Sequence, residues 1–100
     1  MLKDFFIGFI KIHILYHASQ GPIYGVGILE ELGRHGYRLS PGTLYPTLHR
    51  LAREGYLESS SKVVGGKVRR YYTITERGLV ALEEARRKIA ELVNEVLLDK

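Results

Sequence analysis

The chain has 100 residues, no cysteine and a formal net charge of +4 at pH 7. A chain of this length forms one domain with a modest core, and the lack of cysteine excludes disulfides, thiolate metal sites and thiol redox sensing. Hydrophobic residues make up 45% of the chain, which excludes extended disorder. The excess of positive charge favours an anionic partner.

The first predicted element is a helix over residues 3–18, which ends before Gly21. Apolar side chains go nearly all the way round it, so the helix requires cover on every side. Because so small a domain covers one or two faces at most, we expect a second copy of the chain to complete the cover. We expect neither a signal peptide nor a membrane span, since Asp4 precedes the apolar run and Lys11, His13 and His17 interrupt it, whereas a span needs about 20 apolar residues to cross a bilayer. The expected location is the cytoplasm.

Two further helices are predicted before residue 55. One covers residues 24–34; the next begins at Pro41, because Ser40 is a good N-cap and proline suits the first helical position, and it ends at Gly55. The leucines of this third helix share one face, which leaves small, hydrogen-bonding and basic side chains on the opposite face. Such a face fits the major groove of DNA. Pro46 leaves two options open: a distorted first turn, or a regular helix that starts further along the chain.

A β-hairpin follows, with strands predicted over residues 57–63 and 67–74 and a glycine-containing turn between them. Strand alternation puts Tyr72 against the core. Four basic residues lie near the tip, where they can reach phosphate groups or a minor groove: Lys62, Lys67, Arg69 and Arg70. The other interpretation is a solvated hairpin whose charges only keep it soluble.

The last predicted helix covers residues 75–98 and is capped by Thr75. Its apolar residues follow the alternating three and four spacing of a coiled-coil seam, with a second apolar stripe beside it. The order of elements indicates an α+β, mainly helical fold. It consists of a winged helix-turn-helix over residues 1–74 and a C-terminal dimerisation helix over residues 75–100, which packs with the helix over residues 3–18.

Positive charge is concentrated in residues 40–74, where six Lys or Arg residues stand against two acidic ones, a net charge of +4. Positive charge grouped on a helix and an adjoining hairpin is typical of a protein that binds duplex DNA. We therefore predict that the third helix reads the major groove and that the hairpin contacts phosphate. A winged-helix module that binds an acidic protein remains an alternative.

Three stretches of the sequence form a set: Y-G at residues 24–25, S-P-G-T-L-Y-P at residues 40–46, and R-Y-Y-x-I-T at residues 70–75. Together they resemble the PadR-like transcriptional regulators, and the resemblance covers nearly the whole chain. It implies a homodimeric winged-helix repressor that binds a pseudo-palindromic operator. It also implies DNA contacts from Tyr24, Thr43, Tyr45, Pro46 and Arg50.

The complete prediction comprises two sets of residues. The DNA-binding set is Tyr24, Ser40, Thr43, Tyr45, Pro46, Thr47, His49, Arg50, Arg53, Lys62, Lys67, Arg69 and Arg70. The dimer-interface set is Phe5, Phe6, Phe9, Leu82, Ile89, Leu92, Val93, Val96 and Leu97.

Weaker signals lie on the first helix. His13 and His17 are one turn apart and could ligate a metal ion beside a third ligand, but two histidines on one helix do not make a site, so we predict no metal and no cofactor. Phe5, Phe6 and Phe9 could line a pocket for a small apolar effector, although packing in a dimer core is the simpler interpretation. A ligand- or metal-sensing dimer whose main output is not DNA binding therefore stays open. No residues have the spacing of a catalytic motif, which argues against an enzyme.

Overall fold

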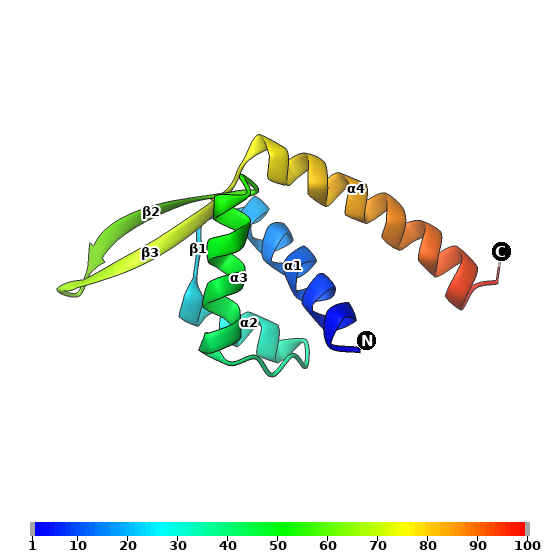
Figure 1. The fold of residues 1–100 in the computed structure, drawn as a ribbon, viewed down its shortest axis with the longest axis horizontal. Helices are drawn as coiled ribbons and strands as arrows, with labels where there is room; N and C mark the ends of the chain where they lie inside the picture. Colours follow the sequence, from blue (N-terminus) through cyan, green and yellow to red (C-terminus); the bar gives the residue numbers. More distant parts are fainter. Residues whose placement is uncertain (1, 100) are drawn as a thin grey trace.

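The structure is a computed structural model that describes residues 2–99 (Figure 1). Its elements follow in the order α1 (Leu2–Gln20), β1 (Ile23–Tyr24), α2 (Gly25–Arg34), α3 (Pro41–Arg53), β2 (Leu57–Val64), β3 (Lys67–Ile74), α4 (Glu76–Leu92) and the π-helical turn η1 (Val93–Leu97). Residues 2–99 thus form four α-helices and a three-stranded antiparallel sheet, the predicted winged helix-turn-helix. Met1 and Lys100, which the predicted domain ranges include, lie outside the described residues.

The core lies where α1, α2, α3 and the base of the sheet meet. The leucines of α3 recur every three or four residues, so they fall on one face, and Leu44 and Leu48 are completely buried there. Ile14 from α1, Leu32 from α2 and Tyr72 from β3 complete the most deeply buried group. Tyr72 takes the core position that strand alternation predicted, so the hairpin is attached to the helices by a buried side chain.

The sheet contains one strand that we did not predict from the sequence. β1 pairs with β3, with Ile23 opposite Tyr72 and Tyr24 opposite Tyr71, and the strand order is β1-β3-β2. We predicted that the second helix begins at Tyr24, but this residue has an extended backbone, with φ −139° and ψ 160°, and precedes α2 as its N-cap. The hydrogen-bonding partners of β1 lie almost fifty residues further along the chain, so no local pattern marks this strand.

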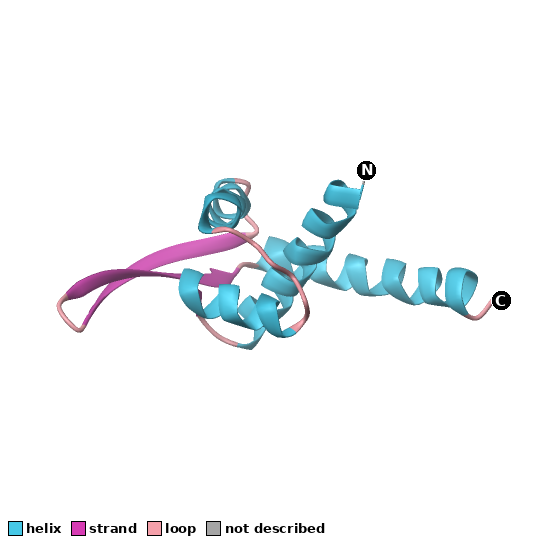
Figure 2. Ribbon diagram, turned by 90° about the horizontal axis from the view of Figure 1, so that it is seen from below, coloured by secondary structure: helices cyan, strands magenta, loops and turns pink. Residues whose placement is uncertain are grey.

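α4 begins directly after β3, beside the end of α3. The Thr75 hydroxyl oxygen accepts a hydrogen bond from the Gly78 N–H at 3.1 Å, which confirms the predicted cap, and the hydroxyl donates to the Gly55 carbonyl at 2.6 Å. From there α4 runs away from the hairpin, and the two lie at opposite ends of the 54 Å long axis (Figures 1 and 2). The site for a nucleic acid and the site for a second chain can therefore be separate.

Apolar side chains on α1 and α4 remain exposed on the single chain. Phe5, Phe9 and Leu92 expose 50%, 48% and 50% of their surface, and α1 and α4 diverge on the side away from the sheet (Figure 2). Leu82 differs, because it is only 3% exposed and belongs to the core of its own chain. Leu82, which the seam spacing placed in the predicted dimer interface, therefore offers almost no surface to a partner chain, because the core of its own chain already covers it. No helix within residues 2–99 is both long and apolar enough to span a bilayer.

Gly78 provides a test of the junction at the start of α4. It is buried, and a Cβ built there would overlap the Tyr56 carbonyl oxygen and the side chain of Ile74. We expect Gly78→Ala to lower the free energy of unfolding by about 1–3 kcal/mol, because the backbone oxygen cannot yield without moving the hairpin.

Gly33 on α2 is the matched control, since no atom lies within 4 Å of a Cβ built there. Gly33→Ala should leave stability unchanged or raise it by up to ~1 kcal/mol, the difference in helix propensity. Urea unfolding of both variants measures this, and equal stabilities for the two would contradict the tight junction.

Candidate nucleic-acid interface

The face of α3 opposite the core carries polar and basic side chains. Tyr45, His49 and Arg50 are exposed, whereas Leu44 and Leu48 on the other face are fully buried. This is the division that the helical pattern predicted. It leaves hydrogen-bonding groups and positive charge in solvent along one side of the helix.

The first turn of α3 resolves the question raised by Pro46. The helix begins at Pro41 and continues through Pro46, and the N–H groups of Thr43 and Leu44 both donate to the Ser40 carbonyl at 3.0 Å. A shared acceptor of this kind is common at helix ends, so the helix starts at Pro41 and the later start that Pro46 left open does not apply. The Ser40 side chain makes no capping bond to the backbone; its hydroxyl lies 3.3 Å from the Thr43 hydroxyl. Two hydroxyls therefore lie together at the end of α3 where backbone N–H groups point outward.

Two aromatic rings orient the basic side chains of the hairpin. The rings of Tyr24 and Tyr71 meet edge to face with centroids 5.6 Å apart. The Arg69 guanidinium lies 4.2 Å from the centre of the Tyr24 ring and donates to the Tyr71 hydroxyl at 3.5 Å, and this hydrogen bond raises the pKa of Arg69. Lys62 lies 5.6 Å from the centre of the Tyr71 ring. Cation–π contacts of this kind favour a fixed direction for the two charges.

A groove of about 430 Å³ separates α3 from the hairpin. Residues of the predicted DNA-binding set line it from three elements: Tyr24 from β1, Tyr45 and His49 from α3, and Lys67, Arg69 and Arg70 from β3. One wall therefore carries three cations, and the other carries aromatic side chains that can donate or accept hydrogen bonds. A phosphodiester backbone requires this combination of charge and hydrogen bonding.

The other predicted residues lie outside this groove. Ser40 and Thr43 line a second hollow, of about 820 Å³, between α1 and residues 35–40. Thr47 is half-buried, and its hydroxyl donates to the Thr43 carbonyl at 2.9 Å, so only its oxygen lone pairs remain for an outside partner. The remaining members are exposed on α3 or on the hairpin: Pro46, Arg50, Arg53 and Lys62.

Gly25 is part of the groove, although the predicted set does not contain it. The Tyr45 ring lies so close to Gly25 that a Cβ there would come within 2.6 Å of the ring carbon Cζ. The absence of a side chain at the start of α2 therefore decides where Tyr45 lies. The sequence signal was the glycine itself, since a glycine often marks a close approach between elements.

The fold and the groove define a winged-helix protein with a basic hairpin, and comparisons identify its family. The family model described as "Transcriptional regulator PadR-like family" matches residues 14–84. The chain is 49% identical over 96 residues to transcriptional regulator Rv3488 of Mycobacterium tuberculosis, covering 96% of this chain and 90% of that protein. The chain therefore belongs to the PadR-like family of transcriptional regulators, as its motifs predicted.

Solved structures agree with this assignment. A PadR family transcriptional regulator from Eggerthella lenta matches with a TM-score of 0.83 and 31% identity, covering 96% of this chain and 85% of that one. A PadR-like regulator from Bacillus cereus matches with a TM-score of 0.76 and 36% identity, covering 90% and 92%. The family and the relatives' names indicate a transcriptional regulator rather than an enzyme.

Gly25→Ala tests the role of the close approach. The added methyl group displaces the end of the Tyr45 ring, which can turn away, so the fold should persist while the wall of the groove changes. We expect affinity for duplex DNA to fall about tenfold, which corresponds to about 1.4 kcal/mol. Fluorescence anisotropy with a labelled duplex measures the change.

Gly33→Ala is again the control, because it adds the same methyl group to the same helix in open space. Its affinity for DNA should equal that of the unsubstituted protein. An equal loss in both variants, or no loss with Gly25→Ala, would show that the position of Tyr45 does not matter for binding.

Proposed function

We propose that the protein is a homodimeric repressor that binds a pseudo-palindromic operator in the cytoplasm. The observation that supports it most strongly is the groove between α3 and the hairpin, where three cations and three hydrogen-bonding aromatic residues of the predicted set share one concave surface. α3 enters the major groove, where Tyr45 and His49 can reach base edges. The hairpin lies along the neighbouring backbone, where its Lys and Arg side chains contact phosphate.

The exposed apolar surface of α1 and α4 supports the homodimer. Members of the predicted interface set expose large fractions of apolar surface, among them Phe5 at 50% and Leu92 at 50%. An apolar patch that runs over two helices is typical of an interface rather than of a monomer surface. Two copies that bury it present two α3 helices related by a two-fold axis, which requires operator halves about one helical turn, roughly 34 Å, apart.

Leu92→Glu tests the interface. A carboxylate placed in an apolar interface loses its hydration without gaining a partner, so the dimer should dissociate at concentrations where the unsubstituted protein is dimeric. Sedimentation equilibrium measures the mass. Val63→Glu makes the same chemical change at the hairpin, where Val63 is 73% exposed, and should leave the dimer intact. A Leu92→Glu protein that stays dimeric would contradict an interface at α4.

Salt dependence tests the phosphate contacts. A dimer that contacts about six to eight phosphates should show a slope of roughly −5 to −7 when the logarithm of the association constant is plotted against the logarithm of the salt concentration. Arg53→Ala or Lys67→Ala removes two contacts per dimer and should make the slope shallower by about 2.

Arg87→Ala is the matched control for these substitutions. Arg87 is an exposed arginine on α4 that pairs with Glu84, far from the groove, so the slope should not change. A slope near zero for the unsubstituted protein, or equal slopes in all variants, would exclude the proposed contacts.

Selection from a randomised duplex pool tests sequence-specific readout. A dimer should select a symmetric consensus, whereas a module that binds an acidic protein should select none.

A further inference from the structure

Three of the four histidines come together between α1 and α2. His13 and His17 lie one turn apart on α1, and His35 follows α2 as its C-cap. The ring centroid of His13 is 4.7 Å from that of His35, and the His17 centroid is 6.4 Å from each of the others. One ring nitrogen of each residue lies within 4.8 Å of the other two. From the sequence we predicted no metal site because a third ligand was missing, and the fold supplies His35 in that position.

The spacing suits a tetrahedral cation after small side-chain rotations. With metal–nitrogen bonds of about 2.0–2.1 Å, ligand nitrogens in such a site are about 3.4 Å apart. His35 is exposed and the other two are half-buried, so the rings can turn about their side-chain bonds without a change in the backbone. Three imidazoles match the preference of zinc, whereas magnesium and calcium prefer oxygen ligands.

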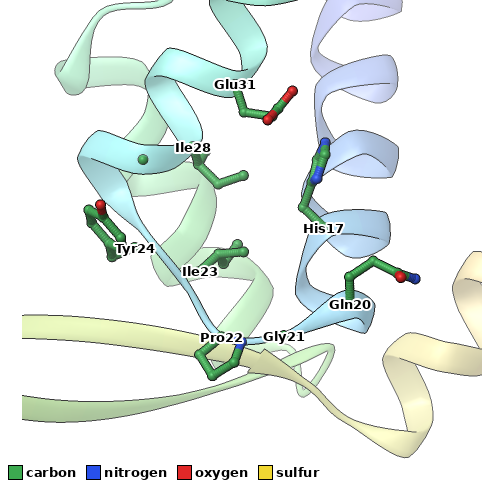
Figure 3. Close-up of a pocket in the computed structure, with 9 residues that line it drawn as sticks. His17, Gln20, Gly21, Pro22, Ile23, Tyr24, Ile28 and Glu31 are labelled. Atoms are coloured by element: carbon green, nitrogen blue, oxygen red, sulfur yellow. The ribbon is translucent and has the colours of Figure 1, made fainter.

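Glu31 supplies negative charge beside the cluster. One carboxylate oxygen lies 3.5 Å from Nε2 of His35, and the other accepts a hydrogen bond from Arg34 at 2.8 Å. Figure 3 shows Glu31 on α2 and His17 on α1 extending toward the same space between the two helices. A carboxylate that accepts a hydrogen bond from a metal-bound imidazole orients the ring and raises its basicity, which makes Glu31 a positioning residue.

The opposite side of the cluster faces a hollow of about 380 Å³ between α1 and α4. Arg86 lines this hollow, and its positive charge would repel a cation bound to the histidines. Its guanidinium donates to Glu83 at 3.2 Å, and this ion pair offsets part of that charge. The hollow gives a cation access from solvent.

We propose that His13, His17 and His35 form a binding site for a divalent transition-metal cation of the zinc class. The cation ties α1, whose exposed face belongs to the proposed dimer, to residues 35–40, which lead directly into α3. Tyr37 in that connection already packs against His13, with ring centroids 5.3 Å apart. Binding therefore changes operator affinity, by about fivefold or more, through the position of α3 relative to the dimer axis. This last step rests on the proposed function.

Isothermal titration of protein without a polyhistidine tag tests the site. We expect one Zn²⁺ per chain and no binding of Mg²⁺. Single substitutions His17→Gln and His35→Gln should each weaken Zn²⁺ binding at least tenfold, and Glu31→Gln should weaken it about tenfold through the orientation of His35. His49→Gln removes the fourth histidine, which lies on α3 and outside the cluster, and should leave Zn²⁺ binding unchanged. Far-UV circular dichroism checks that each variant is folded; His35, which is exposed, carries the least risk to the fold.

Two results would overturn the site: no Zn²⁺ binding by the unsubstituted protein, or binding by folded His35→Gln that equals it. Co²⁺ as a probe adds an independent readout, since a tetrahedral site gives visible absorption bands that His35→Gln should abolish. Operator affinity measured with and without Zn²⁺ tests the coupling separately. A protein that binds Zn²⁺ but never DNA would refute the proposed function and leave the metal site standing, whereas unchanged operator affinity with bound Zn²⁺ would refute the coupling alone.

Discussion

Tyr72 is the residue on which the geometry of the groove depends. It lies in β3, the central strand of the sheet, between Ile23 of β1 and Ser59 of β2, and only 2% of its surface is exposed. Its ring belongs to the same core as Leu44 and Leu48 of α3. The hairpin and α3 therefore share one buried anchor, and the basic residues beyond that anchor keep a fixed direction relative to Tyr45 and His49.

The same arrangement separates two surfaces of the molecule. Basic side chains line the groove, whereas most of the large exposed apolar side chains lie on α1 and along α4 and the turn η1 that follows it. The hairpin and α4 extend toward opposite ends of the long axis (Figure 1). α1 contributes both to the core beneath α3 and to the exposed apolar surface, because Ile14 and Leu15 on one side pack into the core while Phe5 and Phe9 on another remain exposed. A change in how α1 packs therefore affects both the proposed dimer and the position of α3. The histidine cluster lies where α1 meets the end of α2: two of its histidines are on α1, and the third is the C-cap of α2.

Features that depend on neighbours along the chain could be predicted from the sequence. The start of α3 at Pro41, the strand over residues 67–74 and the Thr75 cap follow from local chemistry, since caps, turns and alternation act over a few residues. The order of these local elements indicated the winged helix-turn-helix, and the motifs added the family. Together these patterns predicted most of the fold, including α3 and β3, two of the three elements whose predicted residues line the groove.

Features that depend on residues far apart in the sequence could not be predicted. β1 exists because Tyr71 and Tyr72 pair with it, and two residues carry too little pattern to reveal a strand. The seam spacing included Leu82 but does not indicate whether a second chain or the core of the same chain covers this residue. The approach of His35 to α1 likewise results from the packing of two helices and not from any motif.

In the proposed complex, α3 and the hairpin of two chains contact one operator together. Hydroxyl-radical footprinting of the complex on a selected operator tests it most directly, because protection reports backbone contacts nucleotide by nucleotide. We expect two symmetric protected regions about one helical turn apart, each extended outward by the hairpin, and loss of the outer part alone when Lys67 and Arg70 are replaced by alanine. A single asymmetric protected region that these substitutions leave unchanged would contradict the account.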